Sequence, residues 1–346
     1  MSGKDHQFVF NFLWVYKIKK GPNGEILRYK ARWVARDFSQ KYGVDFTEIF
    51  APTIRYSSLR LLLSMANHFD LDLYGLDVSN AFARSEITDH KLYVQQPTGH
   101  EKRSSSGKPY VCHLQKGLYG TKQAARLWNQ KFKKFLLARG WRQYESDPCL
   151  FSRHTQRYGH ELIGLYVDDI CHCTSSEKAH KALLQACNSE FPTTSQGPLS
   201  WILGMSVKRD RANRILSLDQ RQSIFDFLNT WNHNFKSSSR PTPTSEKWNY
   251  GSEPPSTDEE VIKQYRSQVG SLNFYAQTTR PDIAYPVSVL CRYLSIPNVQ
   301  CLTAVRHIMS YLAGNLDIGI SYVGQDNLAL EADCDANWGS PNDSTT

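Results

Sequence analysis

Two adjacent aspartates interrupt an apolar stretch of the chain. Residues 162–173 read LIGLYVDDICHC, so Asp168 and Asp169 lie between residues that are typical of a buried β-strand. Burying an unpaired carboxylate is costly, and two neighbouring carboxylates also repel each other. A chain accepts such a pair on a surface turn, beside a cationic partner or around a metal ion. An apolar strand that ends in Asp-Asp predicts a β-hairpin whose tip carries both side chains.

A third aspartate ends another apolar strand. In residues 71–82, LDLYGLDVSNAF, a short predicted strand leads to Asp77. Carboxylates from separate strand ends can meet at one edge of a sheet and hold divalent ions. Mg²⁺ prefers oxygen ligands and usually shares them with substrate phosphates. Two such ions about 3.5–4 Å apart support an in-line displacement at phosphorus. Metal ions would therefore account for the cost of placing Asp77, Asp168 and Asp169 together.

The positive charge of the chain is concentrated near its start. The net charge is +8, and residues 14–41 contribute eight Lys and Arg residues against two acidic residues. Residues 14–36, WVYKIKKGPNGEILRYKARWVAR, predict a β-hairpin around a Pro-Asn-Gly turn. In its second strand Arg28, Lys30 and Arg32 share one face. Such a face keeps an exposed strand soluble, and it also suits a polyphosphate or a nucleic-acid backbone. Together with the aspartates it predicts phosphoryl or nucleotidyl transfer.

Length and composition narrow the class of protein. The 346 residues suffice for two or three compact domains, and an aromatic content of 12% argues against wholesale disorder. No apolar run approaches the roughly 20 residues of a membrane helix, and the opening MSGKDHQFVF lacks a signal-peptide core. The eight scattered cysteines are typical of a reducing compartment. We therefore expect an intracellular protein, cytoplasmic or nuclear, that is neither secreted nor membrane-bound.

The remaining pattern predicts a mixed chain of helices and strands. Residues 237–257 are rich in Ser and Pro and form the one clear linker. Residues 171–173, CHC, lack a second Cys/His cluster at zinc-finger spacing and are interpreted as strand residues. Amphipathic helices are expected over 57–69, 121–141, 176–190, 259–277, 281–294 and 303–313.

Several of these segments resemble one family. LYVDDI resembles the Tyr-x-Asp-Asp box of reverse transcriptases, and GLDVSNAF resembles their first metal-binding motif. Four further segments are similar to the Pol polyprotein of copia-type LTR retrotransposons: YKARWVARDFSQKYGVDFTEIFAP, CHLQKGLYGTKQAARLW, YRSQVGSLNFYAQTTRPDIAYPVSVLCRYL and DANWGS. The resemblance runs from about residue 13 to residue 340. Ordered motifs over this length are far more specific than an Asp pair alone.

The resemblance implies the metal ligands. Asp77 and Asp168 would be the main ligands of two Mg²⁺ ions, with Asp169 beside them and Mn²⁺ as an alternative metal. Both ions would serve the addition of a dNTP to a primer on an RNA or DNA template.

The resemblance also implies substrate contacts. Lys30 and Arg32 would hold the triphosphate of the incoming dNTP. Phe82 occupies the steric-gate position, where an aromatic ring under the sugar excludes a 2′-hydroxyl. Gln123 would lie on the sugar side of the nucleotide, and Tyr166 belongs to the box that contacts substrate.

The implied fold is an α+β right-hand polymerase, with fingers, palm and thumb and an antiparallel palm sheet, over residues 1–236. The linker 237–257 would lead to a connection region, 258–325, and to a truncated RNase H-like start, 326–346. Asp335 matches the first catalytic aspartate of that domain, but only eleven residues follow it. We therefore expect a fragment of a longer retroelement protein.

Two functions remain open at this point. One is an RNA-directed DNA polymerase that uses two-metal nucleotidyl transfer. The other is a catalytically silent retroelement remnant that at most binds nucleic acid nonspecifically. The three intact aspartates favour the first, and the truncated ends favour the second. A metal-dependent nuclease has only Asp335 to support it. The pattern predicts no oligomeric state.

Overall fold

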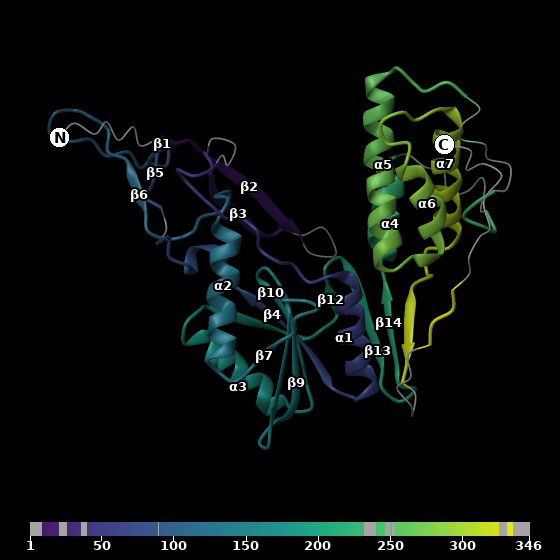
Figure 1. Cartoon of the computed structure of the whole chain (residues 1–346), viewed down its shortest axis with the longest axis horizontal. Helices are drawn as coiled ribbons and strands as arrows, with labels where there is room; N and C mark the ends of the chain where they lie inside the picture. Colours follow the sequence, from purple (N-terminus) through teal and green to yellow (C-terminus); the bar gives the residue numbers. More distant parts are fainter. Residues whose placement is uncertain are drawn as a thin grey trace.

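The computed structural model describes residues 9–20, 26–35, 40–88, 90–231, 240–245, 250, 253–324 and 331–334. Asp335 and the Pro-Asn-Gly turn of the predicted hairpin lie outside these residues. The described parts form an elongated molecule with a small sheet at one end, a central sheet with a hairpin beside it in the middle, and a group of helices at the other end (Figure 1).

The central sheet has six strands, and all of its neighbouring strands are antiparallel. This confirms the antiparallel sheet predicted from the sequence. In spatial order the strands are β11 (Thr193–Pro198), β4 (Asp72–Val78), β10 (Asp169–Thr174), β9 (Gly159–Tyr166), β8 (Leu150–Thr155) and β7 (Arg142–Gln143).

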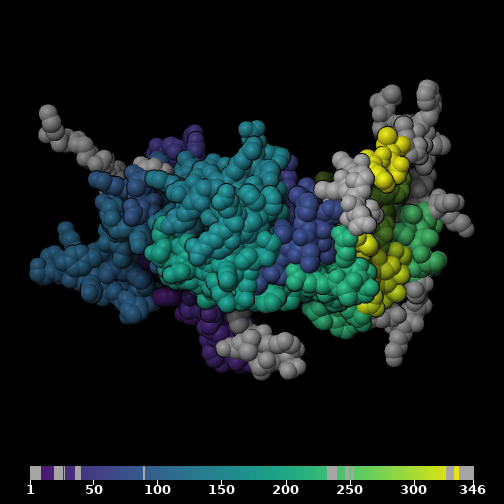
Figure 2. Space-filling model, turned by 90° about the horizontal axis from the view of Figure 1, so that it is seen from below, coloured from purple at the N-terminus to yellow at the C-terminus, as the bar shows by residue number. Residues whose placement is uncertain are grey.

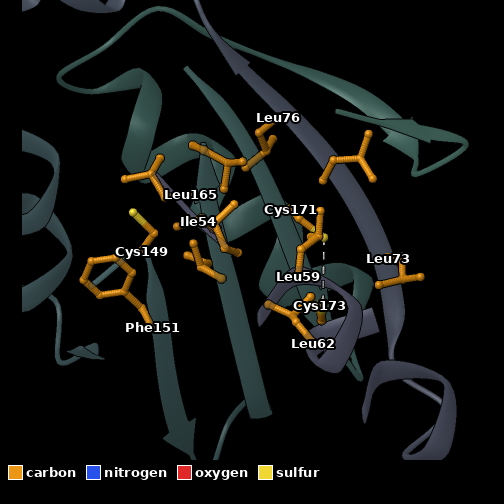
Figure 3. Packing of buried hydrophobic residues seen from close by; sticks show 14 of the residues in the cluster. Ile54, Leu59, Leu62, Leu73, Leu76, Cys149, Phe151, Leu165, Cys171 and Cys173 are labelled. Carbon is orange, nitrogen blue, oxygen red and sulfur yellow. Dashed lines mark hydrogen bonds between the residues drawn. The ribbon is translucent and has the colours of Figure 1, made fainter. Parts of the chain in front are cut away.

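Helices cover both faces of this sheet (Figure 1). Helix α1 (Tyr56–His68) packs on one face, and α2 (Ala124–Leu137) and α3 (Glu177–Asn188) lie on the other. Figure 3 shows leucines of α1 beside Cys171 and Cys173, whose sulfur atoms are 4.0 Å apart. Both cysteines belong to β10 and are fully buried in the hydrophobic cluster, which agrees with their interpretation as strand residues.

The predicted basic hairpin is confirmed. Strands β2 (Phe12–Lys20) and β3 (Ile26–Ala35) pair antiparallel, and Lys17 lies opposite Lys30. The opposite face of the hairpin carries aromatic residues, among them Tyr16 and Tyr29, which are both about three-quarters exposed. A separate sheet of three strands, β1 (Val9–Phe10), β5 (Leu92–Val94) and β6 (Cys112–Leu114), packs at the base of this aromatic face.

The helices at the other end of the molecule share one hydrophobic cluster. They are α4 (Arg221–Thr230), α5 (Glu259–Thr278), α6 (Ala284–Cys291) and α7 (Val299–Gly314), with a short 3₁₀-helix, η3 (Pro281–Ile283), before α6. Figure 2 shows these green and yellow segments at the opposite end from the blue segment between β5 and β6.

A second antiparallel sheet flanks the helical unit α4–α7. Its strands are β12 (Trp201–Ile202), β13 (Met205–Asp210), β14 (Ile215–Asp219) and β15 (Ile320–Val323). Because β14 precedes α4, and β15 follows α7 and pairs with β14, the chain enters and leaves the unit side by side.

The predicted linker, residues 237–257, lies between α4 and α5 of this one unit. Its described residues contact α7: the Thr242 carbonyl is 2.9 Å from His307 Nε2, and Asn298 Nδ2 donates to the Tyr250 carbonyl at 2.6 Å. The domain limits drawn from the sequence stay a prediction. Among the described helices, none is long and apolar enough to cross a membrane.

Candidate active site

The three aspartates come together at one end of the central sheet. Strands β4 and β10 pair so that Asp169 lies directly opposite Asp77. Directly opposite residues share a face, and their Cβ atoms are about 4.5–5.5 Å apart. Asp168 belongs to the turn between β9 and β10, and its carbonyl accepts a hydrogen bond from Val78 N at 3.1 Å. The aspartates therefore meet at strand ends, as the sequence pattern predicts.

Negative charge is concentrated at this end of the sheet, where neighbouring carboxylates help to raise the pKa values of Asp168 and Asp169. Burial, with the charges of Asp168 and Asp77, raises the pKa of Asp169 to about 6. Burial and Asp77 also raise the pKa of Asp168, whereas Lys30 and Arg32 act on this pKa in the opposite direction. The cationic face of the hairpin is thus close enough to Asp168 to offset part of its negative charge.

The donor chemistry of the site suits a hard divalent cation. Three carboxylates supply the oxygen ligands that Mg²⁺ and Mn²⁺ prefer. Burial is the main cause of the raised pKa of Asp169, and repulsion from Asp168 and Asp77 adds to it; a bound cation would relieve that repulsion. Within the described ranges, however, no three His, Cys, Asp or Glu side chains are arranged as a set of metal ligands. The carboxylates are therefore gathered but do not form a closed coordination shell.

Tyr119 is a site residue that the sequence analysis did not single out. Its ring lies between Phe82, at 4.8 Å between ring centroids, and the Arg32 guanidinium, at 5.4 Å from the ring centroid. Burial and the charge of Asp168 raise the pKa of its hydroxyl, and a hydrogen bond with Arg32 lowers it. The residue lies in the quoted segment CHLQKGLYGTKQAARLW. Nothing local in that segment indicates which side chains it meets.

Phe82 lies just beyond the aspartate of β4. It belongs to a 3₁₀-helix, η2 (Ala81–Arg84), and its ring is half-buried against the core. The backbone of Gly117 passes so close that an added Cβ would lie 2.6 Å from the Phe82 carbonyl oxygen. This close approach fixes the Phe82 segment against the loop that carries Tyr119.

Comparison with known sequences decides the family. Residues 3–242 match the family described as reverse transcriptase (RNA-dependent DNA polymerase). The chain belongs to the reverse transcriptase family. This confirms the resemblance inferred from the motifs.

Its relatives include proteins of transposons. The chain is 35% identical over 317 residues to the "Retrovirus-related Pol polyprotein from transposon TNT 1-94" of Nicotiana tabacum, covering 90% of this chain and 24% of the relative. It is 34% identical over 333 residues to the corresponding polyprotein from transposon RE2 of Arabidopsis thaliana, covering 95% and 22%. A putative transposon Ty5-1 protein of Saccharomyces cerevisiae is 32% identical over 269 residues, covering 78% and 85%. The chain thus spans about a quarter of the length of the two plant polyproteins.

Two residues predicted to contact substrate differ in how they are placed. Gln123 is fully buried; its Nε2 donates to the Asp45 carbonyl, and its Oε1 accepts from Gln40, both at 3.1 Å. Its amide therefore links α2 to the loop around Asp45, and its contact with a nucleotide stays a prediction. Tyr166 is half-buried at the end of β9, where it pairs with Asp169.

A close contact connects the hairpin β2–β3 to the loop that carries Tyr119. The Ala35 amide at the end of β3 donates to the Tyr119 carbonyl at 2.8 Å. Gly120 has a φ of +83°, and a Cβ there would collide with the Ala35 carbonyl oxygen. A glycine is required at this position because both its conformation and its surroundings exclude a side chain.

Proposed function

We propose that this reverse transcriptase is an RNA-directed DNA polymerase that adds dNTPs to a primer 3′ end on an RNA or DNA template. The observation that carries the proposal is the register that sets Asp169 opposite Asp77, with Asp168 in the adjoining turn. The cations of the hairpin, whose charges reach Asp168, supply the complementary half of a nucleotide site.

Each group has a role in the proposed reaction. Asp77, Asp168 and Asp169 would hold two Mg²⁺ ions, or Mn²⁺ in their place. When bound, these ions would activate the primer 3′-oxygen and stabilise the leaving pyrophosphate. Lys30 and Arg32 bind the triphosphate oxygens through charge-assisted hydrogen bonds.

The remaining groups select and confine the nucleotide. The Phe82 ring closes the space under the sugar, where a 2′-hydroxyl would clash. Tyr119 holds the Arg32 guanidinium and the Phe82 ring at their positions beside the aspartates.

The proposal also assigns the parts of the right hand. The hairpin β2–β3 with the three-stranded sheet β1–β5–β6 forms the fingers, and the six-stranded sheet with α1–α3 forms the palm. We assign the helical unit α4–α7 as the thumb, because its helices share one cluster at the opposite end of the molecule from the sheet β1–β5–β6. This unit includes residues for which the sequence predicts a connection region.

Primer extension by the purified chain, on an RNA template with Mg²⁺, tests the proposal. Asp77→Asn and Asp169→Asn should each lower the rate by more than about a hundredfold, because each removes a carboxylate that would hold the Mg²⁺ ions. Asp72→Asn is the matched control. It lies in the same strand as Asp77 and forms an ion pair with Arg211 at 2.7 Å instead, so its rate should stay that of wild type.

The silent-remnant alternative predicts a different result. The wild-type chain would bind primer–template with a steep salt dependence but would add no nucleotide with either Mg²⁺ or Mn²⁺. That result would reject the polymerase function and keep only the binding function.

A further inference from the structure

The turn that carries Asp168 has a strained backbone. Val167 and Asp168 form a two-residue connection between Tyr166 and Asp169, which pair with each other. Val167 has a φ of +56°. Glycine is the usual residue at the first position of a hairpin turn that needs a positive φ, and a β-branched side chain is strongly disfavoured there. Such a conformation persists only where the surrounding structure fixes it.

Two hydrogen bonds from different elements fix this turn. The Trp128 indole Nε1 of α2 donates to the Val167 carbonyl at 2.6 Å. The Val78 amide of β4 donates to the Asp168 carbonyl at 3.1 Å. The two successive peptide groups of the turn are therefore held from the helix side and from the strand that carries Asp77.

The Trp128 side chain is buried and closely packed. The side chain is only 1% exposed. Its ring packs against Phe132 and Phe191, with centroid distances of 5.4 Å and 5.2 Å. A buried indole N–H ordinarily finds an acceptor, and here the acceptor is a backbone carbonyl of the aspartate turn.

We propose that Trp128 is a positioning residue, whose N–H sets the orientation of the Val167 peptide and thereby places the Asp168 carboxylate for catalysis. This inference rests on the proposed polymerase function. Trp128 acts through the backbone and contacts neither nucleotide nor metal. A displacement of about 1 Å at a reacting group can cost about a hundredfold in rate, so the loss of one distant donor can be felt at the site.

Trp128→Phe tests the proposal, because it keeps an aromatic ring in the core and removes the donor. We expect kcat for primer extension to fall at least about tenfold, with the KM for dNTP changed less than about threefold. Mn²⁺ affinity, measured by calorimetry without substrate, should fall as well. An unchanged kcat and an unchanged Mn²⁺ affinity would overturn the proposal.

Trp141→Phe is the matched control. Trp141 is 3% exposed, in the same hydrophobic cluster. Its indole nitrogen has no hydrogen-bond partner in the part of the chain that the structure describes. The same substitution there removes no bond to the turn, so kcat and Mn²⁺ affinity should match wild type. An equal loss in both variants would mean that core packing, and not the Trp128 N–H, causes the effect.

A double-mutant cycle with Val167→Gly tests the link to strain. Glycine adopts a positive φ without steric cost, so the turn should depend less on the hydrogen bond from Trp128. Trp128→Phe should therefore reduce kcat by a smaller factor in the Val167→Gly background than in wild type. If kcat fell by the same factor in both backgrounds, the Trp128 hydrogen bond would not act by holding the strained turn.

Amide hydrogen exchange separates this inference from the proposed function. Trp128→Phe should speed exchange of the amides of Asp168, Asp169 and Val78, whereas Trp141→Phe should not. This measurement needs no enzymatic activity. It therefore shows whether the Trp128 N–H holds the turn even if the wild-type chain extends no primer. If Trp128→Phe fails to fold, 3-benzothienylalanine at position 128 removes the N–H while keeping the size of the ring. Unchanged exchange at the turn would overturn the proposal.

Discussion

At the scale of single residues, the side chains around the aspartates differ in their burial, hydrogen bonds and charge, and therefore in how each could contact a ligand. The buried Gln123 amide bonds to Asp45 and Gln40, whereas the Phe82 ring is half-buried and in contact with Tyr119. Lys30 and Arg32 influence Asp168 from a neighbouring hairpin. The residue-scale predictions therefore concern Phe82, Lys30 and Arg32. Each prediction is tested by kinetics with the nucleotide that the residue is proposed to contact.

Phe82→Ala should relax the exclusion of ribonucleotides. The ratio of kcat/KM for a dNTP to that for the matching rNTP should fall by more than about tenfold, because the variant opens space for the 2′-hydroxyl. Metal dependence should stay unchanged. Phe225→Ala, on a half-exposed position of α4, is the control. Full discrimination in Phe82→Ala would reject the steric gate but not the polymerase function.

Lys30→Ala and Arg32→Ala should each raise the KM for dNTP by about ten- to a hundredfold, since each removes a charge-assisted contact worth about 1.5–3 kcal/mol. Steady-state kinetics at fixed ionic strength measure the effect. Lys181→Ala serves as the control, because Lys181 is exposed on α3 and pairs with Glu177. Nucleotide affinity that survives both substitutions would count against the hairpin assignment.

At the scale of elements, a buried polar chain joins α3 to the central sheet. His172 of β10 and His180 of α3 approach at 3.4 Å through their Nδ1 atoms, and His180 Nε2 lies 2.9 Å from Ser195 Oγ. His180 also stacks on Tyr74 of β4 at 3.9 Å between ring centroids. Glu161 and Arg153 extend the network beyond His172. The helix is therefore docked partly by histidines that must stay neutral.

This network predicts acid sensitivity. Burial, followed by the charges of His172 and Lys181 against that of Glu177, lowers the pKa of His180 to about 4. The unfolded chain takes up a proton at about pH 6.5, which the folded chain refuses until about pH 4. The free energy of unfolding should therefore fall by up to about 3 kcal/mol as pH decreases through this window.

Denaturant titrations between pH 7 and pH 4 measure this dependence. His180→Phe keeps a ring against Tyr74 and should flatten the curve in that window. His100→Gln, on an exposed loop, should leave its slope unchanged. A His180→Phe curve parallel to that of wild type would show that His180 does not carry the effect.

At the scale of the whole molecule, Arg60 joins helix α1, on the central sheet, to the helical unit α4–α7. Arg60 donates from Nη1 to the carbonyls of Gln277 and Thr278 at the end of α5, at 2.8 Å and 2.7 Å. The same helix end meets Tyr56 through Phe274, with ring centroids 6.0 Å apart. Free carbonyls at a helix end need partners, and here Arg60 of α1 supplies them.

Arg60→Ala should loosen this junction. We expect fewer nucleotides added per binding event, with the rate of single-nucleotide addition unchanged, because the aspartates are not touched. A trap assay for processivity measures the effect. Arg266→Ala is the control, since Arg266 donates to the Leu294 carbonyl within the helical unit itself. Wild-type processivity in Arg60→Ala would show that the Arg60 contacts do not contribute to processivity.

Local patterns carried much of the prediction. The hairpin was predictable because charged and aromatic residues alternate along β3, and alternation fixes which side chains share a face. The helix with Trp128, Phe132 and Phe135 inward was predictable for the same reason at helical spacing, and all three are buried in α2. Strands ending in aspartate were visible as apolar runs that stop at a charge.

Contacts between distant segments were not predictable in this way. The sequence marks Asp77 and Asp169 as strand-end residues, but only the pairing of β4 with β10 sets them opposite each other. Gln123 shows the same limit, because its partners Gln40 and Asp45 lie about eighty residues away, and only they reveal that its amide is engaged. The linker composition did not reveal that α4 and α5 share one cluster.

The sequence by itself determined the family, the alternating faces of the hairpin and the strands that end in carboxylates, because each is written in residues close together along the chain. Only the tertiary structure decided the partners of those residues. It paired β15 with β14, placed Tyr119 between Arg32 and Phe82, and set the Trp128 indole against the turn before Asp168. Periodicity reports which side of an element is buried, whereas the packing of whole elements selects the atoms that meet there.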